Sequence, residues 1–156
     1  MKKIVIALIM TVAVLFTGIV GCTAAPKDAD VKEVYALIEE SGYLKNMVPV
    51  NKRDMFEVYG IKTDNLVQSV YYQSENCSTN ADEIAIFEVS DSSYIDELVS
   101  ICNTRISSQI TRAEDYSQEE VTKLKKTKVR KVGNYVYYVV SDNYNELMKI
   151  LKDNIG

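Results

Sequence analysis

The side chains able to do chemistry in this chain are carboxylates, lysines, tyrosines and cysteines, because its 156 residues include no histidine. Histidine is the usual general base near neutral pH and the commonest metal ligand in proteins. Its absence excludes the serine–histidine and cysteine–histidine arrangements of hydrolases and argues against a zinc site. The sequence therefore indicates no catalytic residues, no metal site and no cofactor. An enzyme would have to use carboxylates, Tyr or Lys instead.

One acidic pair, Asp82-Glu83, stands at the start of a predicted strand. Adjacent residues of a strand point to opposite faces, so the two carboxylates do not naturally converge on one ligand. Acidic side chains are also seldom fully buried. We interpret the pair as the solvated entrance to a strand and not as a catalytic or metal-binding couple.

Basic residues and tyrosines are the features that could form a binding surface. The stretch from Lys123 to Lys131 is the densest charge, and tyrosine is in excess, with 11 Tyr against 3 Phe and no Trp. The basic run could bind anionic lipid headgroups or an anionic wall polymer, although we favour protection of an edge strand against pairing. The tyrosines could stack on sugars or grip a peptide, although we favour core rings with solvent-facing hydroxyls. The candidate binding surface consists of Tyr116, Tyr135, Tyr137, Lys125, Lys126, Lys128 and Arg130.

Two cysteines, Cys77 and Cys102, could form a disulfide in an exported protein. Cys102 falls on the apolar stripe of a predicted helix, and Cys77 lies in a polar loop. Their Cα atoms would have to come within about 7 Å, which a loop folded over the helix could just allow. We favour a buried Cys102 and an exposed Cys77 over a bridge.

The hydrophobic pattern and the capping residues give the element order α-α-β-β-α-β-β-α, with a short extra helix before the third strand. Asp30, Asn51 and Ser117 are expected helix caps, and either Asp91 or Ser93, with Asp96 completing a capping box, caps the longest helix. Gly133-Asn134 is expected to be a turn with positive φ. The predicted helices are 31–41, 52–59, 94–112, 118–126 and 142–155, and the predicted strands are 66–73, 83–89, 128–132 and 134–141.

The strand at 83–89 is apolar on both faces, with Ile84 and Ile86 pointing one way and Ala85, Phe87 and Val89 the other. Such a strand is normally central in its sheet or covered by helices on both sides. We therefore predict an α+β fold in which an antiparallel sheet of about four strands has helices packed on it. One domain is expected over residues 31–156.

The N-terminus has the features of an export signal. Lys2 and Lys3 precede the apolar stretch 4–16, and Ile19-Val20-Gly21-Cys22 resembles a bacterial lipobox. We predict a signal peptide over residues 1–21, an acylated Cys22 bearing palmitate-type lipid, and a short tether over 22–30. The protein is then exported and anchored by lipid to the outer face of the bacterial cytoplasmic membrane, in an extracellular position.

Removal of residues 1–21 takes away two lysines, so 16 basic residues face 22 acidic ones and the net charge becomes −6. An acidic body is poorly suited to nucleic acid, and we expect no such partner. The expected tether of about eight residues reaches at most roughly 28 Å, which keeps the domain close to the membrane.

The mature chain resembles the DUF4358 family of small bacterial lipoproteins of unknown function, found mainly in Clostridia and related Firmicutes. The resemblance rests on the stretch from Ala81 to Phe87, the long helix after it, Tyr116 and the turn Gly133-Asn134-Tyr135-Val136. It covers about residues 31–152. Gln118 stands where many members have Pro, a departure confined to the start of a helix. The resemblance implies a location and a fold type but no reaction.

These observations predict a non-enzymatic cell-envelope lipoprotein, a tethered module that binds a protein or a cell-wall component such as an anionic polymer. The alternative is a small His-free envelope enzyme or enzyme inhibitor. An exposed apolar or tyrosine patch would favour the binding module. A deep pocket holding two titratable groups with strongly shifted pKa values would favour the enzyme.

Overall fold

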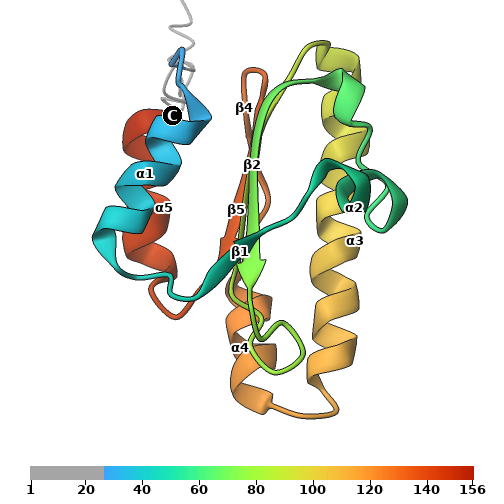
Figure 1. Ribbon diagram of the computed structural model, residues 1–156, viewed down its shortest axis with the longest axis vertical. Coiled ribbons are helices and arrows are strands. Elements are labelled where there is room, and N and C mark those ends of the chain that lie inside the picture. Colours follow the sequence, from blue (N-terminus) through green and yellow to red (C-terminus); the bar gives the residue numbers. More distant parts are fainter. Residues whose placement is uncertain (1–26) are drawn as a thin grey trace, which may run out of the picture.

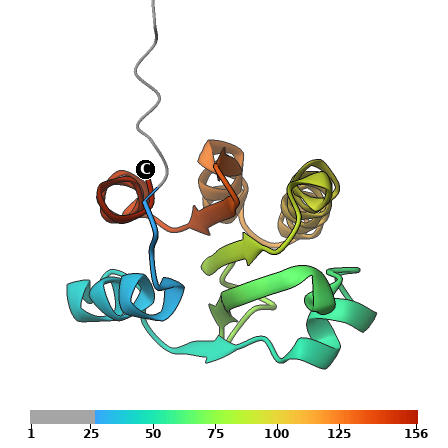
Figure 2. The ribbon, with the colours of Figure 1, turned by 90° about the horizontal axis from the view of Figure 1, so that it is seen from above.

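One antiparallel sheet of five strands, in the order β1-β2-β3-β5-β4, forms the middle layer of the molecule (Figures 1 and 2). This computed structural model describes residues 27–156, so the predicted signal peptide and the predicted acylation of Cys22 lie outside the described residues. The α+β class and the antiparallel sheet are confirmed, with one strand more than expected. In chain order the elements are α1 (Val31–Ser41), β1 (Met47–Pro49), α2 (Lys52–Glu57), η1 (Thr63–Asn65), β2 (Leu66–Ser74), β3 (Glu83–Val89), η2 (Ser92–Tyr94), α3 (Ile95–Ala113), α4 (Gln118–Lys126), β4 (Arg130–Val132), β5 (Tyr135–Val140) and α5 (Tyr144–Asn154).

The central strand β3 is apolar on both faces, as its sequence predicts. Ile84 and Ile86 belong to the core under α1 and α5, whereas Ala85 and Phe87 belong to the core under α2, α3 and α4. The same alternation in β5 divides its buried side chains between the two cores. Helices therefore cover both faces of the sheet, with α1 and α5 on one side and the other three on the opposite side (Figures 1 and 2).

Most helix ends follow the predicted capping residues. The side chains of Asp30, Asn51 and Ser117 accept hydrogen bonds from first-turn backbone N–H groups of α1, α2 and α4. α1 ends at Gly42, whose φ of 68° is left-handed and favours glycine. These local signals position the helices at the sheet as the sequence predicts.

The predicted turn at Gly133-Asn134 forms, with a positive φ of 54° at Gly133, but two other local details differ from the sequence-based predictions. The Ser93–Asp96 capping box is wrong, because Asp91 caps the 3₁₀ turn η2 and α3 then continues from it without a side-chain cap. The edge strand β1 was not predicted, since its three residues are too few to show an alternating pattern and they end in Pro49.

Candidate functional site

A fully buried carboxylate, that of Glu83, lies at the first position of β3. It accepts hydrogen bonds from the hydroxyl of Tyr138 on β5 at 2.5 Å and from the hydroxyl of Tyr71 on β2 at 3.1 Å. From α3, Arg105 Nη2 and Gln109 Nε2 each donate to it at 2.6 Å. These five residues, which we name the Glu83 cluster, join three strands and one helix through a single carboxylate.

The Glu83 cluster holds its groups in fixed protonation states. Burial raises the pKa of Tyr71 and of Tyr138, and the Glu83 carboxylate raises both further, so both hydroxyls stay protonated. Burial lowers the pKa of Arg105, but the facing Glu83 carboxylate outweighs this and the pKa is raised. Burial also raises the pKa of the nearby Cys102 thiol to about 12, which makes it a poor nucleophile. None of these four groups gains or loses a proton near neutral pH. The arrangement therefore indicates a structural role.

The prediction that Asp82-Glu83 is a solvated entrance is therefore wrong for Glu83. The two carboxylates do have separate partners, as expected, because Asp82 pairs with Lys123 of α4 at 2.8 Å. Lys123 also pairs with Glu120 at 2.9 Å and is 5% exposed, so it is not part of a basic surface. Burial lowers the pKa of Lys123, but its hydrogen bonds to Asp82 and Glu120 outweigh this and raise it. This group fastens α4 to the start of β3.

Two of the three tyrosines predicted for a binding surface lie in the core. Tyr135 is 4% exposed, and its hydroxyl accepts from Ala29 N at 3.0 Å and donates to Ala29 O at 3.1 Å. Tyr137 is 1% exposed, and its hydroxyl donates to Gly156 O at 2.7 Å. Both are core residues because α1 and α5 cover this face of β5. Tyr116 lies between α3 and α4 and is exposed.

The basic residues predicted for the same surface are all exposed. Lys125 and Lys126 end α4, Lys128 lies in the connection, and Arg130 begins β4. β4 is an edge strand, so the interpretation of the run as edge protection is consistent with the sheet order. The structure therefore separates these residues from the buried tyrosines of β5.

The two cysteines of the described chain are both free. Cys102 is 2% exposed within the core under α3, as expected. Cys77 is half-buried rather than fully exposed. The prediction of a buried Cys102 is therefore confirmed, and that of an exposed Cys77 is confirmed only in part.

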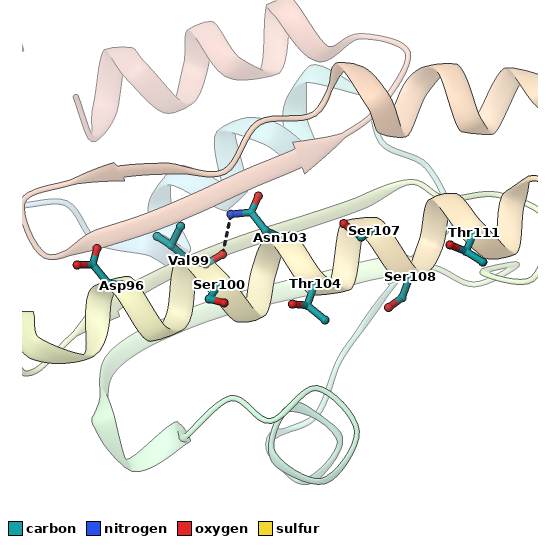
Figure 3. Close-up of a pocket in the computed structure, with 8 residues that line it drawn as sticks. All are labelled: Asp96, Val99, Ser100, Asn103, Thr104, Ser107, Ser108 and Thr111. Carbon is teal, nitrogen blue, oxygen red and sulfur yellow. Dashed lines mark hydrogen bonds between the residues drawn. The ribbon is translucent and has the colours of Figure 1, made fainter.

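On the exposed side of α3, mostly small polar residues line a shallow depression of about 600 Å³ (Figure 3). Its one charged member, Asp96, pairs with Lys131 of β4 at 2.6 Å, and Asn103 Nδ2 donates to the carbonyl of Val99 at 2.9 Å. Binding energy usually concentrates on buried aromatic or arginine anchors. This face offers none of those, and we do not assign it a ligand.

A cleft of about 460 Å³ follows the outer edge of β2, between α1 and the β1–α2 connection. We name it the β2-edge cleft. Its floor is the stretch 69–72 of β2, and Tyr35 of α1 stacks on Tyr72 with ring centroids 4.2 Å apart. The other lining residues are Lys32, Glu39, Pro49, Val50, Asn51, Lys52 and Met55.

The backbone of β2 is open along this cleft. β1 pairs only with the stretch 72–74, and one further bond joins Val50 N to Tyr71 O at 2.8 Å before the chain leaves for α2. In an antiparallel ladder alternate residues direct both backbone groups to the same neighbour. The N–H and C=O of Ser69 must therefore point to the same outer side as those of Tyr71. Within residues 27–156, no strand pairs with Ser69 on that side.

Sequence reasoning missed the β2-edge cleft because it depends on where β1 stops. Two signals were present, namely the tyrosines at 71 and 72 and the proline at 49, which cannot continue a ladder. Neither signal shows which half of β2 stays uncovered.

Within residues 27–156, no helix is both long and apolar enough to span a bilayer, and no three His, Cys, Asp or Glu side chains are grouped to hold a metal ion. No curated protein and no solved structure matches the chain. The model of one family, described as a domain of unknown function, matches residues 39–141, well over half of the chain. The chain therefore belongs to the DUF4358 family.

Proposed function

We propose that this chain is a membrane-tethered, non-enzymatic binding module that captures an extended segment of a partner protein along the open edge of β2. The tether is the lipid on Cys22, and the described domain is the binding part. The observation that carries the proposal is the unpaired outer backbone at Ser69 inside the β2-edge cleft.

An extended peptide is the partner whose chemistry complements this edge. It supplies N–H and C=O groups at the spacing of a strand, and such β-strand addition is a recurring mode of peptide recognition. Natural sheets usually protect their edges. Here β4 is only three residues long and carries Arg130 and Lys131, and β1 ends in Pro49. The uncovered half of β2 has no comparable protection, which supports a role in binding.

The walls of the β2-edge cleft provide side-chain selectivity. Met55 and the Tyr35–Tyr72 stack offer apolar contacts to a side chain that points into the cleft. Lys32 and Lys52 stand on opposite walls, on α1 and α2, and Glu39 lies about two turns further along α1. A peptide with alternating apolar and acidic residues would satisfy both features.

Binding is favoured over catalysis because most titratable groups with strong pKa shifts are sealed in or beside the Glu83 cluster, and burial chiefly raises the pKa of Tyr35, the strongly shifted side chain that stacks on Tyr72 in the β2-edge cleft. Tyr71 and Tyr138 are 4% and 1% exposed, and both hydroxyls already donate to Glu83. The β2-edge cleft itself is lined by surface charges and apolar atoms. No observation on the described residues favours the alternative enzyme.

The tether is tested by metabolic labelling with an alkyne fatty acid in cells that make the full chain. We expect label on the wild-type protein in the membrane fraction and none on Cys22→Ala. Label that persists in Cys22→Ala, or a wild-type protein without label, would show that Cys22 is not the lipidation site.

The binding edge is tested with a photo-crosslinking amino acid in the full-length anchored protein. Val67 is 62% exposed at the open end of β2, and Val58, 66% exposed at the end of α2, is the matched control. We expect crosslinks to a defined partner from position 67 and none from position 58. Ser69→Pro removes the outward N–H and should abolish them, whereas Ser69→Thr should not.

The mode of binding is tested by hydrogen exchange on the Ser69 amide. A synthetic peptide covering the crosslinked segment should slow exchange at Ser69 in the wild-type protein. Unchanged exchange, or crosslinks that survive Ser69→Pro, would rule out strand addition. Crosslinks between two copies of this chain would show that the edge is a dimer interface and not a site for another protein.

A further inference from the structure

A groove of about 390 Å³ lies between the edge strand β4 and α5, on the face of the sheet opposite α3. Arg130 is paired in register with Tyr137, whose side chain belongs to the core under α1 and α5, so Arg130 points toward α5. Lys149 and Lys152, one turn apart on α5, complete the basic wall. The rest of the lining is formed by Tyr144, Asn145, Met148 and Asp153.

The charge in this groove is largely uncompensated. Lys149 pairs with Asp153 at 2.5 Å, and both side chains are well exposed, so the pair is weak. Across residues 27–156, Arg130 and Lys152 take part in no ion pair within 4.0 Å. The groove carries three basic groups against one acid on a domain where 22 acidic residues face 16 basic ones. Positive charge is therefore concentrated here against the sign of the whole domain.

The groove reaches the end of the domain where the described chain begins. Lys27 N donates to Ile155 O at 3.1 Å, and Lys27 Nζ donates to the carbonyl of Asp153, so the start of the chain lies against the end of α5 (Figures 1 and 2). Five residue steps separate Lys27 from Cys22, a reach of at most about 18 Å. A lipid on Cys22 would therefore keep this end of the domain beside the headgroups.

We propose that the β4–α5 groove binds the phosphate of an anionic phospholipid headgroup and thereby fixes the orientation of the domain on the membrane. The proposal rests on the proposed lipid tether. Arg130 presents a planar fork that suits two phosphate oxygens, while Lys149 and Lys152 act as mobile point charges. The β2-edge cleft lies toward the opposite edge of the sheet, so it stays free for a partner.

The test uses the full-length acylated protein in vesicles of phosphatidylcholine, with and without phosphatidylglycerol. A nitroxide at Asn145→Cys, in a Cys77→Ser background, reports from the α5 wall of the groove. We expect phosphatidylglycerol to lower the access of an aqueous relaxation agent to the nitroxide and phosphatidylcholine alone to leave it high. Changing Arg130, Lys149 and Lys152 to Gln together should weaken this dependence on phosphatidylglycerol by about two orders of magnitude.

A matched variant changes three exposed basic residues elsewhere, Lys45, Arg53 and Arg112, to Gln and should behave as the wild-type protein. Equal losses in the two triple variants would overturn the proposal, because they would reflect net charge alone. Protection by soluble glycerol phosphate over phosphatidylcholine vesicles would identify a free phosphate as the ligand and also overturn it. Flotation with phosphatidylcholine vesicles reports the acyl anchor alone, so loss of flotation would contradict the proposed tether. Intact flotation together with nitroxide access that does not depend on phosphatidylglycerol would contradict the proposed groove.

Discussion

The carboxylate of Glu83 shows how one residue determines the packing of several elements. It is fully buried and accepts from Tyr71, Tyr138, Arg105 and Gln109, so its charge is compensated from two strands and one helix. Removing one partner of a buried ion pair leaves the other charged and desolvated. The side-chain carbonyl of Gln109 lacks a partner within the described residues, so the cluster has no donor to spare for this buried acceptor.

Glu83→Gln should lower the free energy of unfolding by about 3–5 kcal/mol, because Arg105 remains charged beside a neutral amide. Tyr138→Phe removes one hydrogen bond to a charged group and should cost about 1.5–3 kcal/mol. Asp96→Asn, which breaks an exposed pair with Lys131, should cost less than about 1 kcal/mol. Chemical denaturation of the three variants measures their free energies of unfolding and thereby the order of the three losses. A Glu83→Gln protein as stable as Asp96→Asn would contradict the buried pair.

The tyrosines of the Glu83 cluster also predict a loss of stability at alkaline pH. The pKa of Tyr71 and of Tyr138 is raised above 10.0 in the folded protein, chiefly by burial. Below pH 10 the folded and the unfolded protein both hold these protons, so the stability that the two tyrosines contribute is fully present. Above pH 10 the unfolded chain releases them and the folded protein does not, so unfolding becomes more favourable. Absorbance at 295 nm should show Tyr71 and Tyr138 ionising only with unfolding. Smooth ionisation of all tyrosines before the loss of circular dichroism would contradict this.

Two patterns in the sequence point to the Glu83 cluster. Strand parity places Glu83 on the same face as Phe87, which faces α3, and Arg105 and Gln109 are one turn apart beside the apolar stripe of that helix. A buried acid and a basic residue facing each other would have followed from these two patterns. The general rule that acids avoid the interior outweighed them.

At the scale of elements, Glu120 in the first turn of α4 shows how a helix start is connected to the sheet. Ser117 accepts from Glu120 N at 3.3 Å, as expected of a helix cap. The Glu120 side chain does not return to the cap. Instead it accepts from Ala81 N at 2.6 Å and pairs with Lys123 at 2.9 Å. Glu120 therefore connects α4 to the loop before β3.

Glu120→Ala should cost more stability than Ser117→Ala. The first leaves the buried Ala81 N–H without its acceptor and takes one partner from Lys123, which together should cost about 2–3 kcal/mol. The second removes one cap hydrogen bond and should cost about 1 kcal/mol. Hydrogen exchange at the Ala81 amide separates the two, since it should accelerate in Glu120→Ala and not in Ser117→Ala. Equal exchange rates in both variants would show that Glu120 acts only within its helix.

The whole molecule consists of two cores that share one sheet. The strong alternation at 83–89 and 135–140 predicted which side chains face each core, and the capping residues predicted most helix ends. The sequence could not predict the strand order, the short β1 or the open half of β2, because those depend on contacts distant in the chain. The candidate binding cleft arises from the same contacts, which explains why residue types alone pointed to Tyr135 and Tyr137 instead.

Because β3 contributes side chains to both cores, the two layers of helices should unfold together. Leu98 of α3 and Leu151 of α5 are each fully buried, one on each face. Leu98→Ala and Leu151→Ala should each cost about 2–5 kcal/mol through lost burial and the cavity left behind. Each variant should still unfold in one transition, with α3 and α5 amides losing protection at the same denaturant concentration. Leu37→Ala, at a 43% exposed site on α1, should change stability by less than about 1 kcal/mol. Separate transitions for α3 and α5 in either core variant would show that the sheet does not couple its two faces.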